Sequence, residues 1–173
     1  SNIQGTNQVS ACVVFRNAVP SKKDYRHFKV KTVVGANDYA TMKEVVNRRY
    51  SRMLQENPED LPQLVVIDGG KGQLAFAYEA LAELGLTEKL TVIALAERME
   101  EVYRVGDPYP MFIDRNSPAL KVLQHIRDEA HRFGITFHRK LRGKAQIESA
   151  LRSIKGVGEK TEQRLLLRFG SVA

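Results

Sequence analysis

Two aspartates fall at positions where the sequence predicts that structural elements begin or end. Asp68 closes the apolar run LVVID and is followed by two glycines. Asp38 follows Asn37, where a helix is expected to begin. Functional residues of open α/β sheets lie beyond the carboxyl ends of the strands. Two carboxylates that meet there would bind Mg²⁺ or Mn²⁺ through oxygen, and such a site suits phosphodiester hydrolysis.

The residues themselves leave a second interpretation of each aspartate open. Asp-Gly and Gly-Gly are common turn dipeptides, so a turn also explains Asp68. A plain helix N-cap also explains Asp38. Lys71, three positions after Asp68, either faces a phosphate or is a helix-start cation that points to solvent.

An arginine and a histidine lie four residues apart in the segment IRDEAHRF, residues 126–133. On a helix, Arg127 and His131 share one face. His131 would serve there as the general base for an attacking water or as a further metal ligand. The alternative is a partly buried histidine bonded to a backbone group. No cysteine lies nearby, which argues against a structural zinc site.

The tail contains the glycine motif IKGVGEK, which lies between two apolar stretches and is followed by TEQRLLLRFGS. This spacing is typical of a helix-hairpin-helix, in which loop amides at a helix N-terminus bind a DNA phosphate. Gly156 and Gly158 would let the backbone approach the phosphate closely. Lys155 and Lys160 would add attraction that does not depend on base sequence.

Hydrophobic periodicity predicts strands first, then alternating helices and strands, then a helical tail. Ser117 and Pro118 are expected to start a long helix, with the proline at its first position. This order predicts an α/β fold with a mixed sheet flanked by helices, followed by a small helical module. The expected strands are 9–15, 25–34, 63–68 and 91–95, of which the first two pair, and a hairpin is expected at 101–114. The other expected helices are 38–55 and 73–84. A basic linker is expected at 142–146, followed by two short helices around GVG.

Composition limits the class of protein. At 173 residues and 43% hydrophobic content, the chain suffices for one core and a small appendage. It has no apolar run near the roughly 20 residues of a membrane span and no expected secretory leader at Ser1. The single cysteine, Cys12, excludes an internal disulfide and fits a cytoplasmic setting.

Residues 1–118 carry 15 Lys/Arg and 15 Asp/Glu, whereas residues 119–173 carry 12 and 5, so the whole net charge of +7 lies in the last third. That surplus is either a phosphate-binding surface or an ordinary solvated helical face.

These pieces together resemble the C-terminal half of the UvrC family of bacterial nucleotide excision repair endonuclease subunits. The matching segments occur in the family's order over nearly the whole chain: SNIQGT (1–6), PSKKDYRHF (20–28), NDYATMKEVVNRRY (37–50), VVIDGGKGQL (65–74), RNSPALKVLQHIRDEAHRF (115–133) and KGVGEKTEQRLLLRFGS (155–171).

The resemblance implies an RNase H-like endonuclease domain over 1–142 and an incomplete helix-hairpin-helix DNA-binding module over 143–173. It implies Mg²⁺- or Mn²⁺-dependent incision of damaged double-stranded DNA on the 5′ side of a lesion, with UvrB, and UvrA upstream, as partners. The family's Asp-Asp-His set maps onto Asp38, Asp68 and His131, the two aspartates being the metal ligands. The expected DNA-binding residues are Lys71, Arg127, Lys155, Gly156, Gly158 and Lys160.

The resemblance also implies a further aspartate just ahead of Ser1, on a first strand that would be truncated here. Without that ligand the fragment is expected to be inactive. A second class of function therefore stays open, a DNA-binding module with an inactive RNase H-like body that positions a partner nuclease. An unrelated nuclease of the same fold, such as a deoxyinosine endonuclease, is disfavoured by the helix-hairpin-helix tail.

Overall fold

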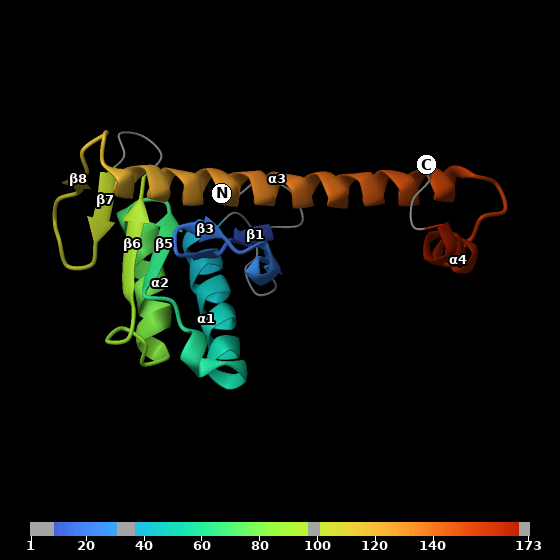
Figure 1. Ribbon diagram of the computed structural model, residues 1–173. Helices are drawn as coiled ribbons and strands as arrows, with labels where there is room; N and C mark the ends of the chain where they lie inside the picture. Colours follow the sequence, from blue (N-terminus) through green and yellow to red (C-terminus); the bar gives the residue numbers. More distant parts are fainter. Residues whose placement is uncertain (1–8, 31–36, 97–100, 170–173) are drawn as a thin grey trace.

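The computed structural model describes residues 9–30, 37–96 and 101–169 (Figure 1). The helices are α1 (Asp38–Glu56), α2 (Lys71–Glu83), α3 (Pro118–Ser153) and α4 (Glu159–Phe169), with 3-10 turns at Lys22–Asp24 and Pro58–Asp60. The strands are β1 (Val9–Cys12), β2 (Phe15–Arg16), β3 (Val19–Pro20), β4 (Arg26–Lys29), β5 (Leu64–Asp68), β6 (Thr91–Leu95), β7 (Glu101–Arg104) and β8 (Met111–Phe112).

A four-stranded sheet in the order β5-β6-β7-β8 forms the centre of the fold. Strands β5 and β6 are parallel, whereas β6 and β7, and β7 and β8, are antiparallel. The predicted mixed sheet flanked by helices is therefore confirmed. Its two apolar runs, 64–68 and 91–95, are the parallel pair; β6 is buried after Thr91, whereas in β5 only Ile67 is buried.

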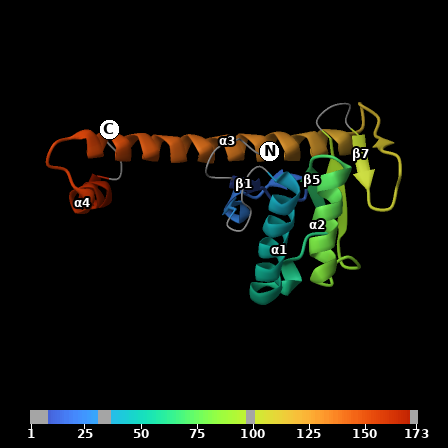
Figure 2. The ribbon, with the colours of Figure 1, turned by 180° about the vertical axis from the view of Figure 1, so that it is seen from behind.

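Alternate residues of β6 enter two separate hydrophobic clusters. Val92 and Ala94 pack with side chains of α1 and α2. Ile93 and Leu95 pack with Val102 of β7 and with Leu123 of α3. Because successive side chains of a strand point to opposite faces, α1 and α2 cover one face of the sheet and the beginning of α3 covers the other. Figure 2 shows α1 and α2 side by side on their face.

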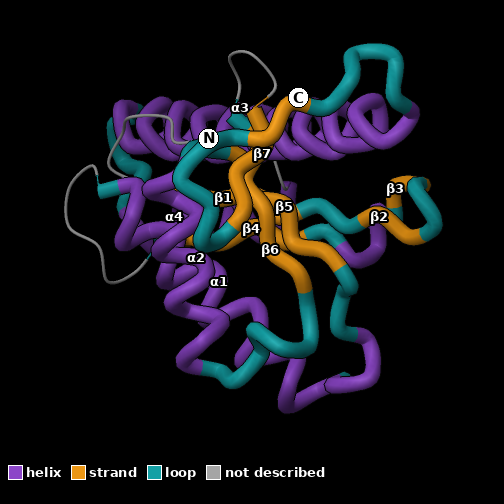
Figure 3. The backbone as a smooth tube through the Cα atoms, turned by 90° about the vertical axis from the view of Figure 1, so that its left-hand side faces the viewer, coloured by secondary structure: helices purple, strands orange, loops and turns teal. Residues whose placement is uncertain are grey.

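The predicted pairing of 9–15 with 25–34 is confirmed for β1 and β4, but the first strand ends at Cys12, and Phe15 begins β2 of another hairpin. Strands β1 and β4 pair antiparallel, from Val9 opposite Lys29 to Cys12 opposite Arg26. In the described residues they form a two-stranded sheet of their own. Strands β2 and β3 form a small second hairpin, which in Figure 3 projects on the side of the central strands opposite α1 and α2. Positions 31–34 of the predicted strand and the SNIQGT segment lie outside the described residues.

Helix α3 begins where the sequence predicts, with the Ser117 hydroxyl accepting from the Ala119 amide and Pro118 in the first position. The expected linker at 142–146 is wrong, because α3 continues through it to Ser153. Of those five residues only Gly143 is a poor helix former, at about 1 kcal/mol relative to alanine, and Arg, Lys, Ala and Gln all favour a helix. The division of domains at 142/143 stays a prediction, and that boundary falls inside one helix.

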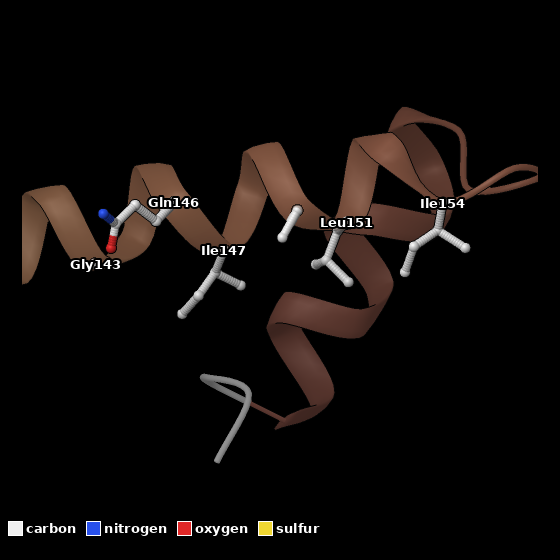
Figure 4. A pocket seen from close by; sticks show the side chains of 6 residues that line it. Gly143, Gln146, Ile147, Leu151 and Ile154 are labelled. Atoms are coloured by element: carbon white, nitrogen blue, oxygen red, sulfur yellow. The ribbon is translucent and has the colours of Figure 1, made fainter.

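Beyond the sheet, α3 projects well past the rest of the domain and α4 lies beneath its far end (Figure 1). Glu162 of α4 is buried, and its carboxylate accepts from Arg152 Nε of α3 at 2.8 Å. A mostly apolar groove runs along this end of α3 (Figure 4), lined by Gly143, Gln146, Ile147, Ala150, Leu151 and Ile154. No helix in the described part of the chain has the length and apolar character to cross a membrane.

Candidate active site

The side chains of Asp68 and His131 are in direct contact, although 63 positions separate them. Oδ2 of Asp68 lies 2.6 Å from Nε2 of His131. Asp68 ends β5 and lies two residues after Val66, so the two side chains point to the same face of the sheet. Val66 packs in the cluster on the α3 face. The carboxylate therefore points toward α3, which carries the histidine. Both side chains are partly exposed, at 24% for Asp68 and 29% for His131, so solvent reaches the pair.

The contact of His131 is not the backbone bond that was its alternative interpretation, and its role as general base or metal ligand stays a prediction. The recorded partner of the imidazole is a carboxylate and not a backbone group. An ionised carboxylate only accepts hydrogen bonds, so with Asp68 ionised the tautomer that fits this contact has its proton on Nε2. Nδ1 is then the ring nitrogen that can accept a proton, which is the arrangement of a carboxylate-oriented general base.

Arg127 lies on the same face of α3, one turn before His131 and one turn after Leu123. Leu123 is buried against the sheet, so this face of the helix is directed at the strands. The Arg127 side chain is only 15% exposed, and its Nε lies 3.5 Å from Asp128 Oδ1. Its Nη1 is buried and has no hydrogen-bond partner among the described residues. A buried guanidinium nitrogen without a partner is costly, which marks Arg127 as a candidate for binding an anion.

The turn from β5 into α2 is shaped by Gln73. Its Oε1 accepts from the Gly70 amide at 3.1 Å, closing the first turn of the helix. A Cβ at position 69 would lie 3.0 Å from the Gln73 side chain, so glycine there leaves room for this cap. Lys71 is exposed, and its Nζ donates to the carbonyl of Pro108 at 3.3 Å. The structure thus directs Lys71 toward the β7–β8 hairpin, and a phosphate contact stays a prediction.

Asp38 is the first residue of α1 and is exposed. The N-cap is Asn37, whose side chain accepts from the Ala40 amide at 3.0 Å. The next residue, Tyr39, fixes the start of α1 against α2. Its ring stacks on Phe76, and a Cβ at Gly72 would come within 2.5 Å of it. Asp38 is therefore adjacent to a contact with the helix that follows Asp68.

Among the residues that the structure describes, no three Asp, Glu, His or Cys side chains are grouped closely enough to hold a metal ion. The metal-ligand roles of Asp38 and Asp68 therefore stay predictions. Their chemistry fits Mg²⁺ or Mn²⁺, because both supply carboxylate oxygen and Asp68 is open to solvent. Mg²⁺ usually keeps several waters and binds through only one or two carboxylates.

Two contacts to the β1–β4 hairpin hold α3 in position beside the site. Tyr25 donates to Glu129 at 2.9 Å, and Arg132 donates to the same carboxylate at 2.6 and 2.7 Å. The Arg132 hydrogen bonds, and then the one from Tyr25, hold the pKa of Glu129 at about 2 against an ordinary 4.5. The His27 ring stacks between Phe133 and Phe137, with centroids 3.7 and 4.0 Å away, and burial lowers its pKa.

The predicted phosphate-binding loop lies between α3 and α4, far from the Asp68–His131 pair. Lys155, Gly156, Gly158 and Lys160 are all exposed there. Gly156 has a φ of +95°, which side-chain-bearing residues rarely adopt, so the turn needs this glycine. From His131 to Gly143, at the near end of the apolar groove, α3 already covers about 18 Å at 1.5 Å per residue. The hairpin function of this loop stays a prediction.

Some positioning residues were not identified from the sequence. Tyr39 and Gly72 are separated by 33 positions, and neither stands out by type. His27 is in a strand with one polar face, where a histidine gives no sign of an aromatic sandwich. The spacing of Phe133 and Phe137, four apart on α3, was the available signal, because such a pair makes one aromatic surface on a helix.

Comparison with known proteins places these features in a family. The profile described as the UvrC RNAse H endonuclease domain matches residues 1–135. A Porphyromonas gingivalis (strain W83) protein named UvrABC system protein C is 58% identical over 172 residues, covering 99% of this chain and 28% of that protein. Proteins of the same name from Flavobacterium johnsoniae and Chlorobaculum tepidum are 57% and 53% identical, covering 99% of this chain and 29% and 27% of their own lengths. The chain thus spans less than a third of the length of the curated relatives it matches.

Proposed function

Because the chain belongs to the UvrC RNase H endonuclease domain family, we propose that it is a divalent-metal-dependent DNA endonuclease domain of nucleotide excision repair. The reaction is hydrolysis of a phosphodiester bond on the 5′ side of a lesion. The single observation that carries this proposal is the 2.6 Å contact between the Asp68 carboxylate and the His131 imidazole. It joins a sheet-end carboxylate to a histidine that is partly open to solvent.

Each of the three residues has a separate role in the proposed reaction. Asp68 and Asp38 would hold Mg²⁺ or Mn²⁺, which supplies positive charge to stabilise the developing charge on the phosphate. Asp68 would also keep the proton on Nε2 of His131, so that Nδ1 can accept a proton from the attacking water. His131 takes a proton from the attacking water, and general-base catalysis of this kind contributes roughly 10²–10⁴-fold to a rate.

Phosphates of the bound strand would be held at two places. Near the reaction centre, Arg127 brings a buried guanidinium nitrogen without a protein partner among the described residues, and Lys71 brings an exposed ammonium group. At the far end of α3, the amides around Gly156 and Gly158 would bind a backbone phosphate, assisted by Lys155 and Lys160. Both sets of contacts are to phosphate, so the binding carries no base preference.

The relatives' name, UvrABC system protein C, points to a multi-protein system. We propose that this chain works there with UvrB, and with UvrA upstream, on damaged double-stranded DNA in the cytoplasm. Damage recognition would belong to those partners.

A second candidate function is an inactive RNase H-like module that binds DNA and positions a partner nuclease. The observation that favours it is the lack of a three-residue metal group among the described residues. It predicts DNA binding without hydrolysis under any divalent metal.

The test is a chimera in which this chain replaces the matching segment of the Porphyromonas gingivalis relative. The chimera is mixed with UvrA, UvrB and an end-labelled duplex carrying one bulky lesion. With Mg²⁺ or Mn²⁺ we expect one product cut on the 5′ side of the lesion, and we expect EDTA to abolish it. The unaltered relative is the positive control.

Incision that persists in EDTA would exclude metal dependence. A chimera that binds the lesion duplex as tightly as the relative but yields no 5′ product under either metal would overturn the endonuclease proposal and support the positioning module.

A further inference from the structure

The middle of α3 carries positive charge that is not balanced by acidic residues. Residues 130–147 contain five Lys or Arg and no Asp or Glu, and four of the five lie at 139–144. Among the described residues, Arg139, Lys140 and Arg142 form no ion pair, and all three are exposed. Lys140 and Lys144 are four residues apart, a spacing at which like charges destabilise a helix. The cluster therefore costs stability in the free protein.

This cluster differs from an ordinary solvated helical face. Such a face intersperses charges of both signs, as α1 does where Arg48 pairs with Glu44 and Arg52 pairs with Glu56. Clustered cations without carboxylates are instead typical of a surface that binds phosphates. The charge surplus of the last third of the chain left both interpretations open, and the pattern at 139–144 favours the phosphate-binding surface.

Arg142 lies on the same face of α3 as His131. The two residues are 11 positions apart, which at 3.6 residues per turn is three turns and about 20°. His138 lies between them on this face, and burial, followed by the charge of Arg142, lowers the pKa of His138. Arg139 is about 60° from Arg142 around the helix. The face that presents the imidazole to Asp68 thus continues along α3 as a pair of exposed arginines.

Lys140 lies on nearly the opposite side of the helix, about 160° from Arg142. Burial lowers the pKa of His27, and the charge of Lys140 adds to this effect, which places Lys140 on the side of the β1–β4 hairpin. One turn of α3 therefore carries two cations of which only Arg142 is in line with the reaction centre.

Arg142 is also midway between the reaction centre and the glycine loop that follows α3. His131 and Ser153, where α3 ends, are 22 positions apart, or about 33 Å at 1.5 Å per residue. Arg142 is 11 positions from each, and α3 is straight over this length in Figure 1. One turn of B-DNA is about 34–36 Å long. A duplex that lies along α3 would therefore present the same groove at both ends and pass the arginines between them.

We propose that Arg139 and Arg142 bind backbone phosphates of duplex DNA that lies along α3, between the Asp68–His131 pair and the glycine loop. This inference rests on the proposed function and adds a third phosphate contact to the two described there. A guanidinium group donates two parallel hydrogen bonds to a phosphate, and among the described residues no carboxylate engages either arginine. The length of α3 then fixes the separation of the outer contacts at one turn of the duplex.

The experiment uses the 173-residue chain in EDTA and a fluorescent duplex longer than two helical turns. Affinity is measured by anisotropy over a range of KCl concentrations for the parent, Arg139→Ala, Arg142→Ala and the double variant. Lys140→Ala is the matched control, because it removes the same charge from the same turn on nearly the opposite side. Alanine is the best helix former, so none of these substitutions interrupts α3.

Each arginine variant should lower the magnitude of the salt slope by about 1, and the double variant by about 2, because each guanidinium neutralises one phosphate. Lys140→Ala should keep the parental slope, since its ammonium group does not face the duplex.

If both arginine variants keep the parental slope, or if Lys140→Ala lowers it as much as Arg142→Ala does, this inference is wrong and the proposed function stands. Residues 139–144 are then a solvated face or a source of undirected attraction. If the parent chain does not bind DNA in any form, the proposed function fails together with this inference.

Discussion

At the scale of single residues, the site depends on two glycines for different reasons. Gly69 leaves room for Gln73, which caps the helix after Asp68. Gly72 lets the Tyr39 ring lie directly against the α2 backbone. The start of α1, where Asp38 lies, is thereby brought next to the start of α2. These close approaches fix how the start of α1 meets the start of α2, so the glycines matter for geometry and not for flexibility.

Replacing Gly72 by alanine should destabilise the fold. The new methyl group would lie 2.5 Å from the Tyr39 ring, so Tyr39 must move. Overpacking of this kind costs about 1–3 kcal/mol, offset by up to about 1 kcal/mol of improved helix propensity. The measurement is the free energy of unfolding in urea. Gly143→Ala is the matched control, because that helical position has nothing within 4 Å and should gain up to about 1 kcal/mol. Equal stabilisation of both variants would show that Tyr39 does not press on Gly72.

Sequence reasoning at this scale singled out Asp68 and His131, which the structure brings into contact, but not the residues that support them. A carboxylate after a buried strand and a histidine on a helix are unusual enough to single out. Nothing in the residue types of Tyr39 or Gly72 indicates that they touch, because contacts between distant elements depend on how those elements pack. The metal-ligand role of Asp38 stays a prediction.

At the scale of elements, the position of α3 is set by the hairpin of β1 and β4. Glu129 receives hydrogen bonds from Tyr25 and Arg132, and His27 is held between Phe133 and Phe137. These contacts lie on a different face of α3 from Arg127 and His131. The hairpin therefore fixes the rotation of the helix, and the rotation determines that His131 meets Asp68.

The Glu129 contacts predict a defined acid dependence of stability. The folded-state pKa of Glu129 is lowered from 4.5 to about 2, chiefly by the Arg132 hydrogen bonds. A lowered pKa means that folding favours the ionised form, so the contribution is fully present above about pH 4.5 and is lost as the pH falls toward 2. Urea unfolding of the parent and of Glu129→Gln should differ at pH 6 and converge below pH 3. A difference that stays constant over this range would assign the effect of the substitution to packing.

Element prediction from periodicity was accurate where a single pattern applied. The run 91–95 is β6 without any shift, and the start of α3 at Pro118 follows from its cap. The linker at 142–146 was wrong because basic and glycine content was given more weight than helix propensity. A lone Gly143 with helix-forming neighbours does not end a helix. The hydrophobic pattern of the sequence did not predict that α3 would project past the rest of the domain.

At the scale of the whole molecule, the excess charge lies in the segment that extends past the Asp68–His131 pair. All of the net charge of +7 belongs to residues 119–173, most of which form the long arm of α3 and α4 (Figure 1). The Asp68–His131 pair lies under the first half of that arm. In the proposed function the arm attracts and holds the duplex, and the compact part performs the chemistry.

This separation predicts that single lysines differ in their effect on DNA affinity. Lys155→Ala should weaken binding for all sequences and lower the magnitude of the salt slope by about 1, because one phosphate contact is lost. Lys89→Ala, with the same change in charge, should leave the slope unchanged. Lys89 precedes β6 and lies at the opposite ends of the parallel strands from Asp68. The measurement is fluorescence anisotropy over a range of KCl concentrations. Equal salt slopes for both variants would show that the arm is not part of the DNA-binding surface.

The most direct test of the account is the incision rate of the chimera with its two reaction-centre residues changed one at a time. Asp68→Asn keeps the shape of the side chain but removes its charge, and we predict 5′ incision at the level of the blank. We predict that His131→Gln lowers the rate by roughly 10²–10⁴-fold. Both variants should bind the lesion duplex like the parent, since the arm is unchanged. If Asp68→Asn cuts the lesion strand at the parent rate, Asp68 and His131 are not the reaction centre.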